Sequence, residues 1–270
     1  MRPLDSGRGY DAGMTSSTPT VAQLTILTGA SRGMGLAMAQ QLLGLGDTLL
    51  CLSRQTSDTL AAQAAAKGTT LIQWSQDLAH GEEAAARLTQ WLATQAASGF
   101  SGATLINNAG VIAQIGPLSA ASPADLAHAL RVGLEAPMQL TAAFLAATEG
   151  WQMPRKVLNI SSGLGRRAMA SQAAYCAAKA GMDHFTRCVA LDEALKPNGA
   201  RVCSLAPGVI DTDMQVQLRG ADAAAFPDRG NFTGMKDKGL LSTPDDAAAR
   251  VLAWLQRPDF GANPVADVRD

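Results

Sequence analysis

The chain has 270 residues, of which 47% are hydrophobic and 17% charged, and its formal net charge is −1. This length suffices for a large buried core, and the lack of long runs of one charge argues against nucleic acid or an anionic membrane as the main partner. No apolar run approaches the roughly 18 residues that a membrane-spanning helix needs. Because the first residues also lack the apolar core of a secretory signal, we expect a soluble cytoplasmic protein.

Residues 1–20 are rich in Ser, Thr, Gly and Pro and predict a flexible tail, whereas residues 21–270 are expected to form one domain. In that domain, apolar runs alternate with stretches of helical period. The predicted strands are 24–30, 48–54, 69–78, 103–110, 156–162 and 200–208. The predicted helices are 34–46, 57–67, 82–97, 123–149 and 171–195, the fourth kinked at Pro137. This alternation predicts an α/β fold, a doubly wound parallel sheet with helices on both faces.

The stretch "TGASRGMG", residues 28–35, follows the first strand and opens the first helix. Glycines there allow a tight turn and let backbone N–H groups approach a pyrophosphate at the helix N-terminus. An ordinary turn is the alternative, but a strand before the glycines and an amphipathic helix after them favour a dinucleotide site. The candidate cofactor residues here are Gly29, Ser31, Arg32, Gly33, Met34 and Gly35.

The end of the second strand indicates which dinucleotide would bind. Sites for NAD usually carry an acid there, which accepts hydrogen bonds from the ribose 2′-hydroxyl. This strand instead ends in "CLSRQ", with Arg54 and no acid nearby, and Arg32 lies within the glycine loop. Two guanidinium groups can hold a 2′-phosphate, although both could also be solvated surface residues. We therefore predict NADP(H).

Polar residues also follow the third and fourth strands. Asp77, with Leu78 after it, is a candidate acceptor for the adenine amino group. In "NNAG", Asn108, Ala109 and Gly110 stand where the backbone would pass close to the cofactor ribose. Ligands of such sheets collect at the carboxyl ends of the strands, where all of these motifs fall.

Tyr175 and Lys179 stand four residues apart, in a chain with only two tyrosines. On a helix this spacing places both side chains on one face, about one turn apart. An ammonium group beside a phenol lowers the phenol's pKa from its ordinary value of about 10. The pair therefore predicts a tyrosine that exchanges a proton with a substrate oxygen near neutral pH.

The motifs "TGASRGMG", "NNAG", "NISS", "YCAAK" and "APGVIDT", in this order and spacing, resemble the short-chain dehydrogenase/reductase family over about residues 22–256. The resemblance implies a Rossmann-type fold in which Ser162 bonds the substrate carbonyl, with Ser161 as the nearby alternative. It implies that Tyr175 is the general acid in reduction or the base in oxidation, and that Lys179 lowers the tyrosine pKa and bonds the nicotinamide ribose. The loop that holds the nicotinamide carboxamide is matched by Pro207, Gly208, Val209 and Thr212.

One position departs from the family pattern. Members usually carry "VNL" in the fourth helix, and the asparagine anchors a water that feeds the lysine, whereas this chain has "VGL" with Gly133. A glycine within a helix is unfavourable by roughly 1 kcal/mol relative to alanine. Its carbonyl could still hold the water, but the side-chain amide is lost. The standard proton relay is therefore in doubt, and an impaired enzyme is one reading.

A narrower resemblance lies downstream. The stretches "LAPGVIDTDMQ" and "MKDKGLLSTPDDAAARVLAWLQRPDFGA" resemble sepiapterin reductases and the bacterial benzil reductases, which use NADPH to reduce vicinal diketones or the dicarbonyl-like side chain of a pterin. In sepiapterin reductases a tail aspartate grips the guanidine-like edge of the pterin. Asp267 is its nearest match here, and a solvated terminal acid is the alternative. The other candidate substrate residues are Leu164 and Met214.

Residues 213–242 mix apolar side chains with glycines, as expected for a mobile substrate lid; a surface excursion with core-facing side chains is the alternative. The apolar residues in question are Met214, Leu218, Phe226, Phe232 and Met235.

The cysteines and histidines show no metal-ligand spacing, so no metal site is expected. Cys51 and Cys203 lie in apolar strand-like runs and are predicted to be buried free thiols. The three histidines are isolated in the sequence and are interpreted as surface or packing residues: His80, His128 and His184.

These observations predict an NADPH-dependent carbonyl reductase that acts on a ketone or vicinal dicarbonyl, with Tyr175 as proton donor. Two alternatives stay open: an NADP-dependent alcohol dehydrogenase of the same family, and a catalytically impaired NADPH-binding module, which Gly133 keeps in view. The family associates through its long fourth and fifth helices, and the helix at 171–195 begins with an Ala-rich stretch that suits close packing. A homodimer or homotetramer is therefore expected.

Overall fold

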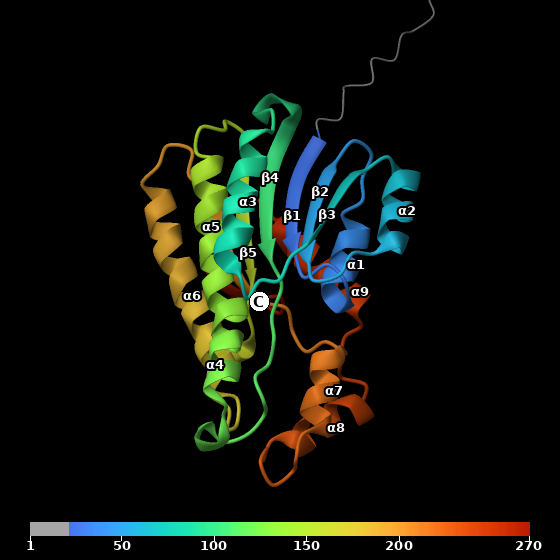
Figure 1. Ribbon diagram of the computed structural model, residues 1–270, viewed down its shortest axis with the longest axis vertical. Coiled ribbons are helices and arrows are strands. Elements are labelled where there is room, and N and C mark those ends of the chain that lie inside the picture. Colours follow the sequence, from blue (N-terminus) through green and yellow to red (C-terminus); the bar gives the residue numbers. More distant parts are fainter. Residues whose placement is uncertain (1–21) are drawn as a thin grey trace, which may run out of the picture.

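A seven-stranded parallel sheet forms the centre of the protein in the computed structural model, which describes residues 22–270 (Figure 1). The strand order is β3-β2-β1-β4-β5-β6-β7, which is a doubly wound α/β fold of the Rossmann type. The strands are β1 (Ala22–Thr28), β2 (Thr48–Ser53), β3 (Thr70–Ser75), β4 (Phe100–Asn107), β5 (Arg155–Ile160), β6 (Arg201–Ala206) and β7 (Val265–Asp267). The α-helices are α1 (Gly33–Gln41), α2 (Asp58–Lys67), α3 (Gly81–Ala93), α4 (Pro123–Leu130), α5 (Ala136–Ala147), α6 (Ala173–Ala194), α7 (Asp213–Gly220), α8 (Arg229–Asp237) and α9 (Pro244–Leu255).

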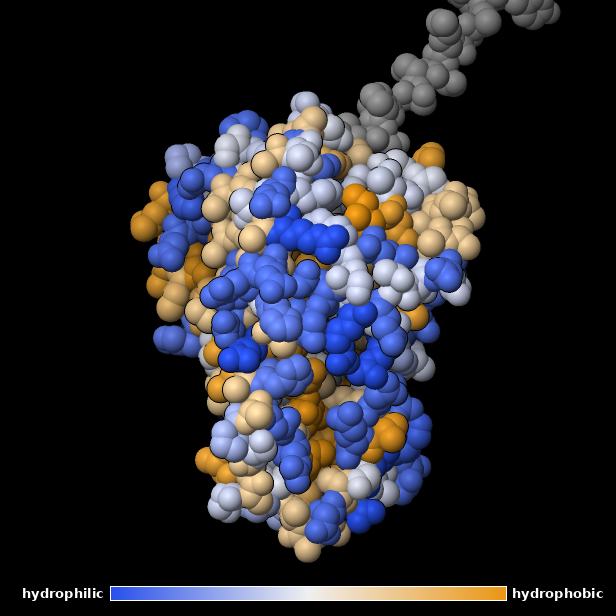
Figure 2. Space-filling model, viewed as in Figure 1, coloured by the Kyte–Doolittle hydropathy of each residue, from blue (hydrophilic) through white to orange (hydrophobic). Residues whose placement is uncertain are grey.

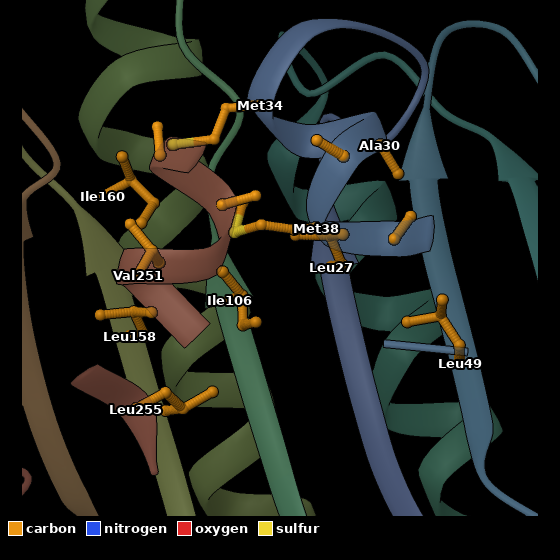
Figure 3. Close-up of a cluster of buried hydrophobic side chains, with 14 of the residues drawn as sticks. Leu27, Ala30, Met34, Met38, Leu49, Ile106, Leu158, Ile160, Val251 and Leu255 are labelled. Atoms are coloured by element: carbon orange, nitrogen blue, oxygen red, sulfur yellow. The ribbon is translucent and has the colours of Figure 1, made fainter. Parts of the chain in front are cut away.

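Helices cover both faces of the sheet, and each face has its own apolar core. Successive residues of a strand point to opposite faces, so Leu27 packs with α1 and α9 while Leu24 and Ile26 pack with α3 and α5. Figure 3 shows the first of these cores, in which Met38 and Val251 meet over the central strands. Because both faces are covered, most strand residues are buried and apolar, with polar residues mainly toward the strand ends.

The sheet changes its winding direction between β1 and β4. From β1 the chain runs outward to β2 and β3, and it then returns to β4 on the other side of β1. The loops after β1 and β4 therefore diverge, and they leave a crevice at the carboxyl ends of these strands. The tail predicted for residues 1–20 lies outside the described residues. Within residues 22–270, no helix has both the length and the apolar character required to cross a membrane.

The helix predicted at 123–149 has its irregularity just before Pro137 rather than at it. This helical stretch consists of α4, a π-helical turn at Arg131–Glu135, and α5. Pro137 lies in the first turn of α5. Proline has no N–H and crowds the carbonyl four residues earlier, which here belongs to Gly133. The wider π turn, closed by a bond from Ala136 N–H to the Arg131 carbonyl, accommodates this crowding.

Several elements after residue 208 have no counterpart among the predicted ones. The strand β7 pairs with β6 from Ser204 to Ala206. Because β7 has only three residues, its sequence contains no apolar run long enough to predict a strand. The helices α7, α8 and α9 were likewise not assigned from the sequence. The free thiols of Cys51 and Cys203 are buried in β2 and β6 as predicted, and burial raises their pKa to about 12 and about 11.

The segment 213–242 contains α7 and α8, which lie below the carboxyl ends of the strands in Figure 1. Its apolar side chains form a small core, in which the rings of Phe226 and Phe232 stack with centroids 5.6 Å apart. This core packs against Ile112 and Ile115 after β4 and against Met169 after β5. Figure 2 shows apolar atoms recessed between polar ones in this lower part of the molecule. We call residues 213–242 the lid segment.

Phe226→Ala is expected to loosen the lid segment without unfolding the sheet, because Phe226 is fully buried in the small core rather than in the two large ones. Amide hydrogen exchange should rise within residues 213–239 and stay unchanged in β1, β4 and β5. Phe144→Ala is the control, since Phe144 is fully buried under the sheet and its loss should lower the free energy of unfolding by about 3–5 kcal/mol. Uniformly faster exchange in Phe226→Ala would contradict a separately packed lid segment.

Candidate active site

The glycine loop after β1 is fastened to the end of β4. The Thr28 hydroxyl oxygen accepts the backbone N–H groups of Asn108 and Ala109, at 2.9 and 3.0 Å. The Asn108 amide donates back to the carbonyls of Thr28 and Gly29, at 3.0 and 3.3 Å. A Cβ on Gly35 would lie 2.0 Å from the Gly29 carbonyl oxygen, so only glycine allows this close approach. The resulting cradle at the start of α1 fits a pyrophosphate.

The two arginines predicted to hold a 2′-phosphate lie at the same end of the crevice. Arg54 directly follows β2, is exposed, and its guanidinium makes no ion pair or hydrogen bond with another described residue. Arg32 pairs instead with Asp213 of the lid segment, at 2.8 Å, and both side chains are 66% exposed. Asp77 accepts the N–H of Ala79 at 2.9 Å and lines the crevice after β3. The two arginines suit the predicted 2′-phosphate, and the Asp77 carboxylate suits the predicted adenine amino group.

The Tyr175 and Lys179 side chains face the end of β5 from the first turns of α6. Lys179 is 4% exposed, and its Nζ donates to the Ile160 carbonyl at 2.7 Å. The Ser162 oxygen accepts the N–H of Leu164 at 3.2 Å, and the hydroxyl lies close enough to the Tyr175 phenol to act as its hydrogen-bond partner. Ser161 points away and donates to Asp183 at 2.5 Å. Of the two serines in the motif, Ser162 therefore faces the tyrosine.

The pKa of Tyr175 is shifted in the direction opposite to the one that the sequence predicts. Burial raises the pKa of Tyr175 above its ordinary value, and the hydrogen bond with Ser162 offsets only part of that rise. Burial also lowers the pKa of Lys179 to about 8, against the opposing charge of Asp183. The Lys179 Nζ lies 5.7 Å from the centre of the Tyr175 ring. In this geometry desolvation outweighs the cation, so the phenol is protonated at neutral pH.

Gly133 lies in the π turn beside the start of α6. A Cβ at this position would lie 3.2 Å from the Cβ of Ala178, the residue before Lys179. Because Pro137 has no N–H, the Gly133 carbonyl cannot receive its regular α-helical hydrogen bond. The carbonyl that could anchor a water is thus retained in a distorted turn, while the side-chain amide is lost.

A single cavity of about 1300 Å³ runs from the glycine loop to the lid segment. All of the residues predicted for the cofactor and the substrate line it: Gly29, Ser31, Arg32, Gly33, Met34, Gly35, Arg54, Asp77, Leu78, Asn108, Ala109, Gly110, Ser162, Leu164, Tyr175, Lys179, Pro207, Gly208, Val209, Thr212, Met214 and Asp267. The fold therefore gathers positions from eight separate stretches of the sequence. Their individual roles stay predictions.

The cavity has lining residues that sequence reasoning missed. His128 lines it from α4, although it was interpreted as a surface or packing residue. Gln172, which is 3% exposed, lines it three residues before Tyr175, and its amide nitrogen has no hydrogen-bond partner. The arginines Arg166 and Arg167 follow Ser162 closely and could have been noticed from that position alone.

Asp267 lines the cavity from β7, but its carboxylate already has a partner. The Arg269 Nε donates to Asp267 Oδ1 at 2.7 Å and Nη2 donates to Oδ2 at 2.5 Å, a two-bond contact between a guanidinium and a carboxylate. The Arg269 hydrogen bond lowers the pKa of Asp267 below its ordinary value, so the carboxylate is ionised. The position predicted to grip a guanidine-like edge is thus occupied by the chain's own guanidinium.

Comparisons with known proteins agree with this geometry. The family model "short chain dehydrogenase" matches residues 23–223. The chain is 33% identical to benzil reductase ((S)-benzoin forming) of Bacillus cereus over 235 residues, which cover 87% of this chain and 94% of that protein. It is 31% identical to sepiapterin reductase of Meriones unguiculatus over 260 residues, covering 91% and 95%.

Among solved structures, the chain resembles a metagenomic short-chain oxidoreductase in complex with NADP. The TM-score is 0.67 at 28% identity, and the match covers 91% of this chain and 94% of that one. With the family model, these relatives and the common fold in agreement, the chain is a member of the short-chain dehydrogenase/reductase family, oxidoreductases that act on alcohol and carbonyl groups.

Proposed function

We propose that this protein is an NADPH-dependent carbonyl reductase whose substrate is a vicinal dicarbonyl compound, with Tyr175 as the proton donor. The observation that carries the proposal is the half-buried phenol of Tyr175, which lies beside Ser162 and Lys179 in a cavity that also contains the glycine cradle. When bound, NADPH supplies the hydride. The substrate oxygen accepts hydrogen bonds from Ser162 and Tyr175, and the Tyr175 proton moves to it as the carbonyl carbon is reduced to an alcohol.

The protonation states of Tyr175 and Lys179 are compatible with reduction. Reduction needs an acid, whereas oxidation of an alcohol needs the phenolate as a base. The raised pKa of Tyr175 supports the protonated phenol at neutral pH, which is the form that reduction uses. Lys179, with a pKa of about 8, carries its charge at neutral pH and stabilises the phenolate left after proton transfer.

The preference for NADPH is supported by the charges at the adenosine end. The residue after β2 is Arg54 rather than an acid, so a cation stands at the position where NAD sites usually carry the carboxylate that binds the 2′-hydroxyl. Arg32 adds a second cation, which Asp213 holds nearby.

An aryl diketone is favoured over a pterin at the substrate end. Five apolar residues contribute to that end beside polar ones such as Arg167 and Asn231, namely Leu164, Met169, Leu218, Phe232 and Met235. The carboxylate of Asp267, which would have to bind a guanidine-like edge, is engaged by Arg269. Benzil, a diketone with two phenyl rings, needs apolar walls and no such carboxylate.

We also propose that the chain forms a homo-oligomer through α4, α5 and α6. Large apolar side chains on these helices are exposed, among them Met138 at 42%, Leu191 at 71% and Leu195 at 86%. Exposed large apolar side chains on packed helices are a feature of subunit interfaces.

The test of the proposed reaction is NADPH consumption with benzil, sepiapterin and a simple monoketone. Benzil should be reduced fastest, and Tyr175→Phe should lower turnover by about 100- to 10,000-fold while NADPH still binds, because only the transferred proton is lost. If NADPH binds but none of the three carbonyls is reduced, the protein is not a reductase of this class. Gly133→Asn then decides whether the missing amide impairs the relay, since restored turnover would identify an impaired enzyme.

Arg54→Gln should raise the KM for NADPH by about 10- to 100-fold and leave the KM for NADH almost unchanged, because it removes a charge-assisted bond to the 2′-phosphate. Arg187→Gln serves as the control, since Arg187 is an exposed arginine on α6 away from the cavity. Equal changes with both cofactors would mean that Arg54 does not read the phosphate.

Arg269→Met should free the carboxylate of Asp267 and lower the KM for sepiapterin by up to about fivefold, the size expected for competition with a partly exposed ion pair. The KM for benzil should not change. Arg257→Met is a matched control, because Arg257 makes the same two-bond contact with Asp259, two residues away, outside the cavity. A parallel change for benzil and sepiapterin would show that Arg269 does not select between them.

A further inference from the structure

A third side chain continues the row formed by Tyr175 and Lys179 on α6. Asp183 lies four residues after Lys179, so the three side chains follow one another at successive turns on one face of the helix. Asp183 is 2% exposed, and proton transfer from Tyr175 makes no use of it. A buried carboxylate is costly unless it is paired and hydrogen-bonded, so its partners indicate what it does.

The partners of Asp183 come from three different segments near the reacting end of the cavity. The hydroxyl of Ser161, at the end of β5, donates to Oδ1 at 2.5 Å, and that of Ser204 in β6 donates to the same oxygen at 2.6 Å. The Nε of Arg166, in the turn after Ser162, donates to Oδ2 at 3.3 Å. Both carboxylate oxygens are therefore engaged.

These bonds hold the backbone on either side of Ser162. Lys179 binds the Ile160 carbonyl and Asp183 binds the Ser161 hydroxyl, so two turns of α6 fix two consecutive residues directly before Ser162. After Ser162, the Arg166 guanidinium joins Asp183 to the Ala266 carbonyl of β7, at 2.7 Å.

The turn that carries Ser162 also lies directly on the helix at this point. A Cβ on Gly165 would lie 2.8 Å from Asp183 Oδ2 and 2.9 Å from the Lys179 carbonyl oxygen. This absence of a side chain lets Arg166 reach Asp183 across a short gap.

We propose that Asp183, acting with Arg166, is a positioning residue for the reaction: it fixes the Ser162 hydroxyl, and through β7 the adjoining wall of the substrate cavity, relative to Tyr175 and Lys179. This inference rests on the proposed function, because it assigns Asp183 its part in that reaction. Asp183 touches neither substrate nor cofactor, and it acts through the residues that do.

The charge of Asp183 has a second effect, on Lys179. Around Lys179, α6 contributes Tyr175 and Asp183, and β5 contributes a backbone carbonyl, while Arg166 in the turn after β5 is bonded to Asp183. The negative charge of Asp183 raises the pKa of Lys179 against the effect of burial, and the resulting pKa is about 8. Reduction needs the ammonium form, so wild-type activity should fall as the pH rises through about 8.

Asp183→Asn tests the proposal with little change of shape. The asparagine oxygen still accepts from Ser161 and Ser204, but its N–H₂ group faces the Arg166 donor and carries no charge. We expect kcat to fall by about 10- to 100-fold, as for a small misplacement of a reacting group, with the KM for NADPH unchanged. The fall of kcat at high pH should move to lower pH, because the charge that raised the pKa of Lys179 is lost. Amide exchange should rise in residues 161–167.

Glu193→Gln is the matched control. Glu193 is also a carboxylate of α6, 3% exposed and close to a buried arginine, Arg155, but it lies at the other end of the helix from Tyr175. This variant should lower the free energy of unfolding without moving the pH profile or the exchange of 161–167. Should Asp183→Asn fail to fold, Ser204→Ala removes one bond to the same carboxylate, and a smaller loss of kcat with the same rise in exchange is expected.

A wild-type kcat and pH profile in Asp183→Asn would overturn the proposal, as would changes that Glu193→Gln reproduces. The exchange measurement needs no substrate. If the wild type reduces no carbonyl but exchange at 161–167 rises only in Asp183→Asn, the positioning contact stands and the proposed function fails. If carbonyls are reduced and exchange does not respond, the positioning role fails alone.

Discussion

The contact between Thr28 and Asn108 is the constraint on which the rest of the site depends. Strands β1 and β4 are neighbours in the sheet, yet these two residues are 80 positions apart in the chain. Two hydrogen bonds join Thr28 to Asn108, a third joins Asn108 to Gly29, and a fourth joins Ala109 to Thr28. Together they fix the glycine loop at the point where the winding of the sheet reverses. This junction fixes the glycine loop relative to the rest of the site, because the cradle at α1 and the reacting groups on β5 and α6 lie on either side of it.

The reacting end of the cavity combines charges that water would normally separate. Lys179 and Asp183 are both almost fully buried, one turn apart, and each makes hydrogen bonds to the end of β5. In a poorly solvated site such contacts are stronger than at the surface, and an unpaired member would be correspondingly costly. The same desolvation keeps Tyr175 protonated. Burial therefore supports the protonated phenol that the proposed reduction uses, and it makes a precise arrangement of partners necessary.

The sequence could predict those parts of the site that are written in short, local patterns. The glycine loop, the residues after β2, β3 and β4, and the Tyr175–Lys179 pair are each confined to a few neighbouring positions. The parallel sheet with helices on both faces follows from the alternation of apolar runs and helical stretches. The fold class and the family were confirmed. Contacts made only by the folded chain could not be read in this way: the Asp183 cluster joins β5, β6 and α6, and the Asp267–Arg269 pair matters only because β7 joins the sheet.

Two expectations also needed physical correction. A cation near a phenol lowers its pKa, but the degree of burial, which decides the outcome for Tyr175, is not visible in the spacing of two residues. Pro137 does disturb its helix, yet the disturbance falls on the π turn before it, since proline acts on the carbonyl four residues earlier. In both cases the local pattern was read correctly and its environment determined the result.

The way the lid segment is attached has a practical consequence. Its link to the glycine loop is the Arg32–Asp213 pair, which is two-thirds exposed and contributes little in salt solution. Its attachment to the rest of the molecule combines the packing of Phe226, Phe232 and their apolar neighbours with ion pairs from Lys236 and Arg219 to Asp211. Salt would weaken these partly exposed ion pairs, whereas organic co-solvents, which are often needed to dissolve aryl ketones, would weaken the apolar packing that also holds the lid segment in place.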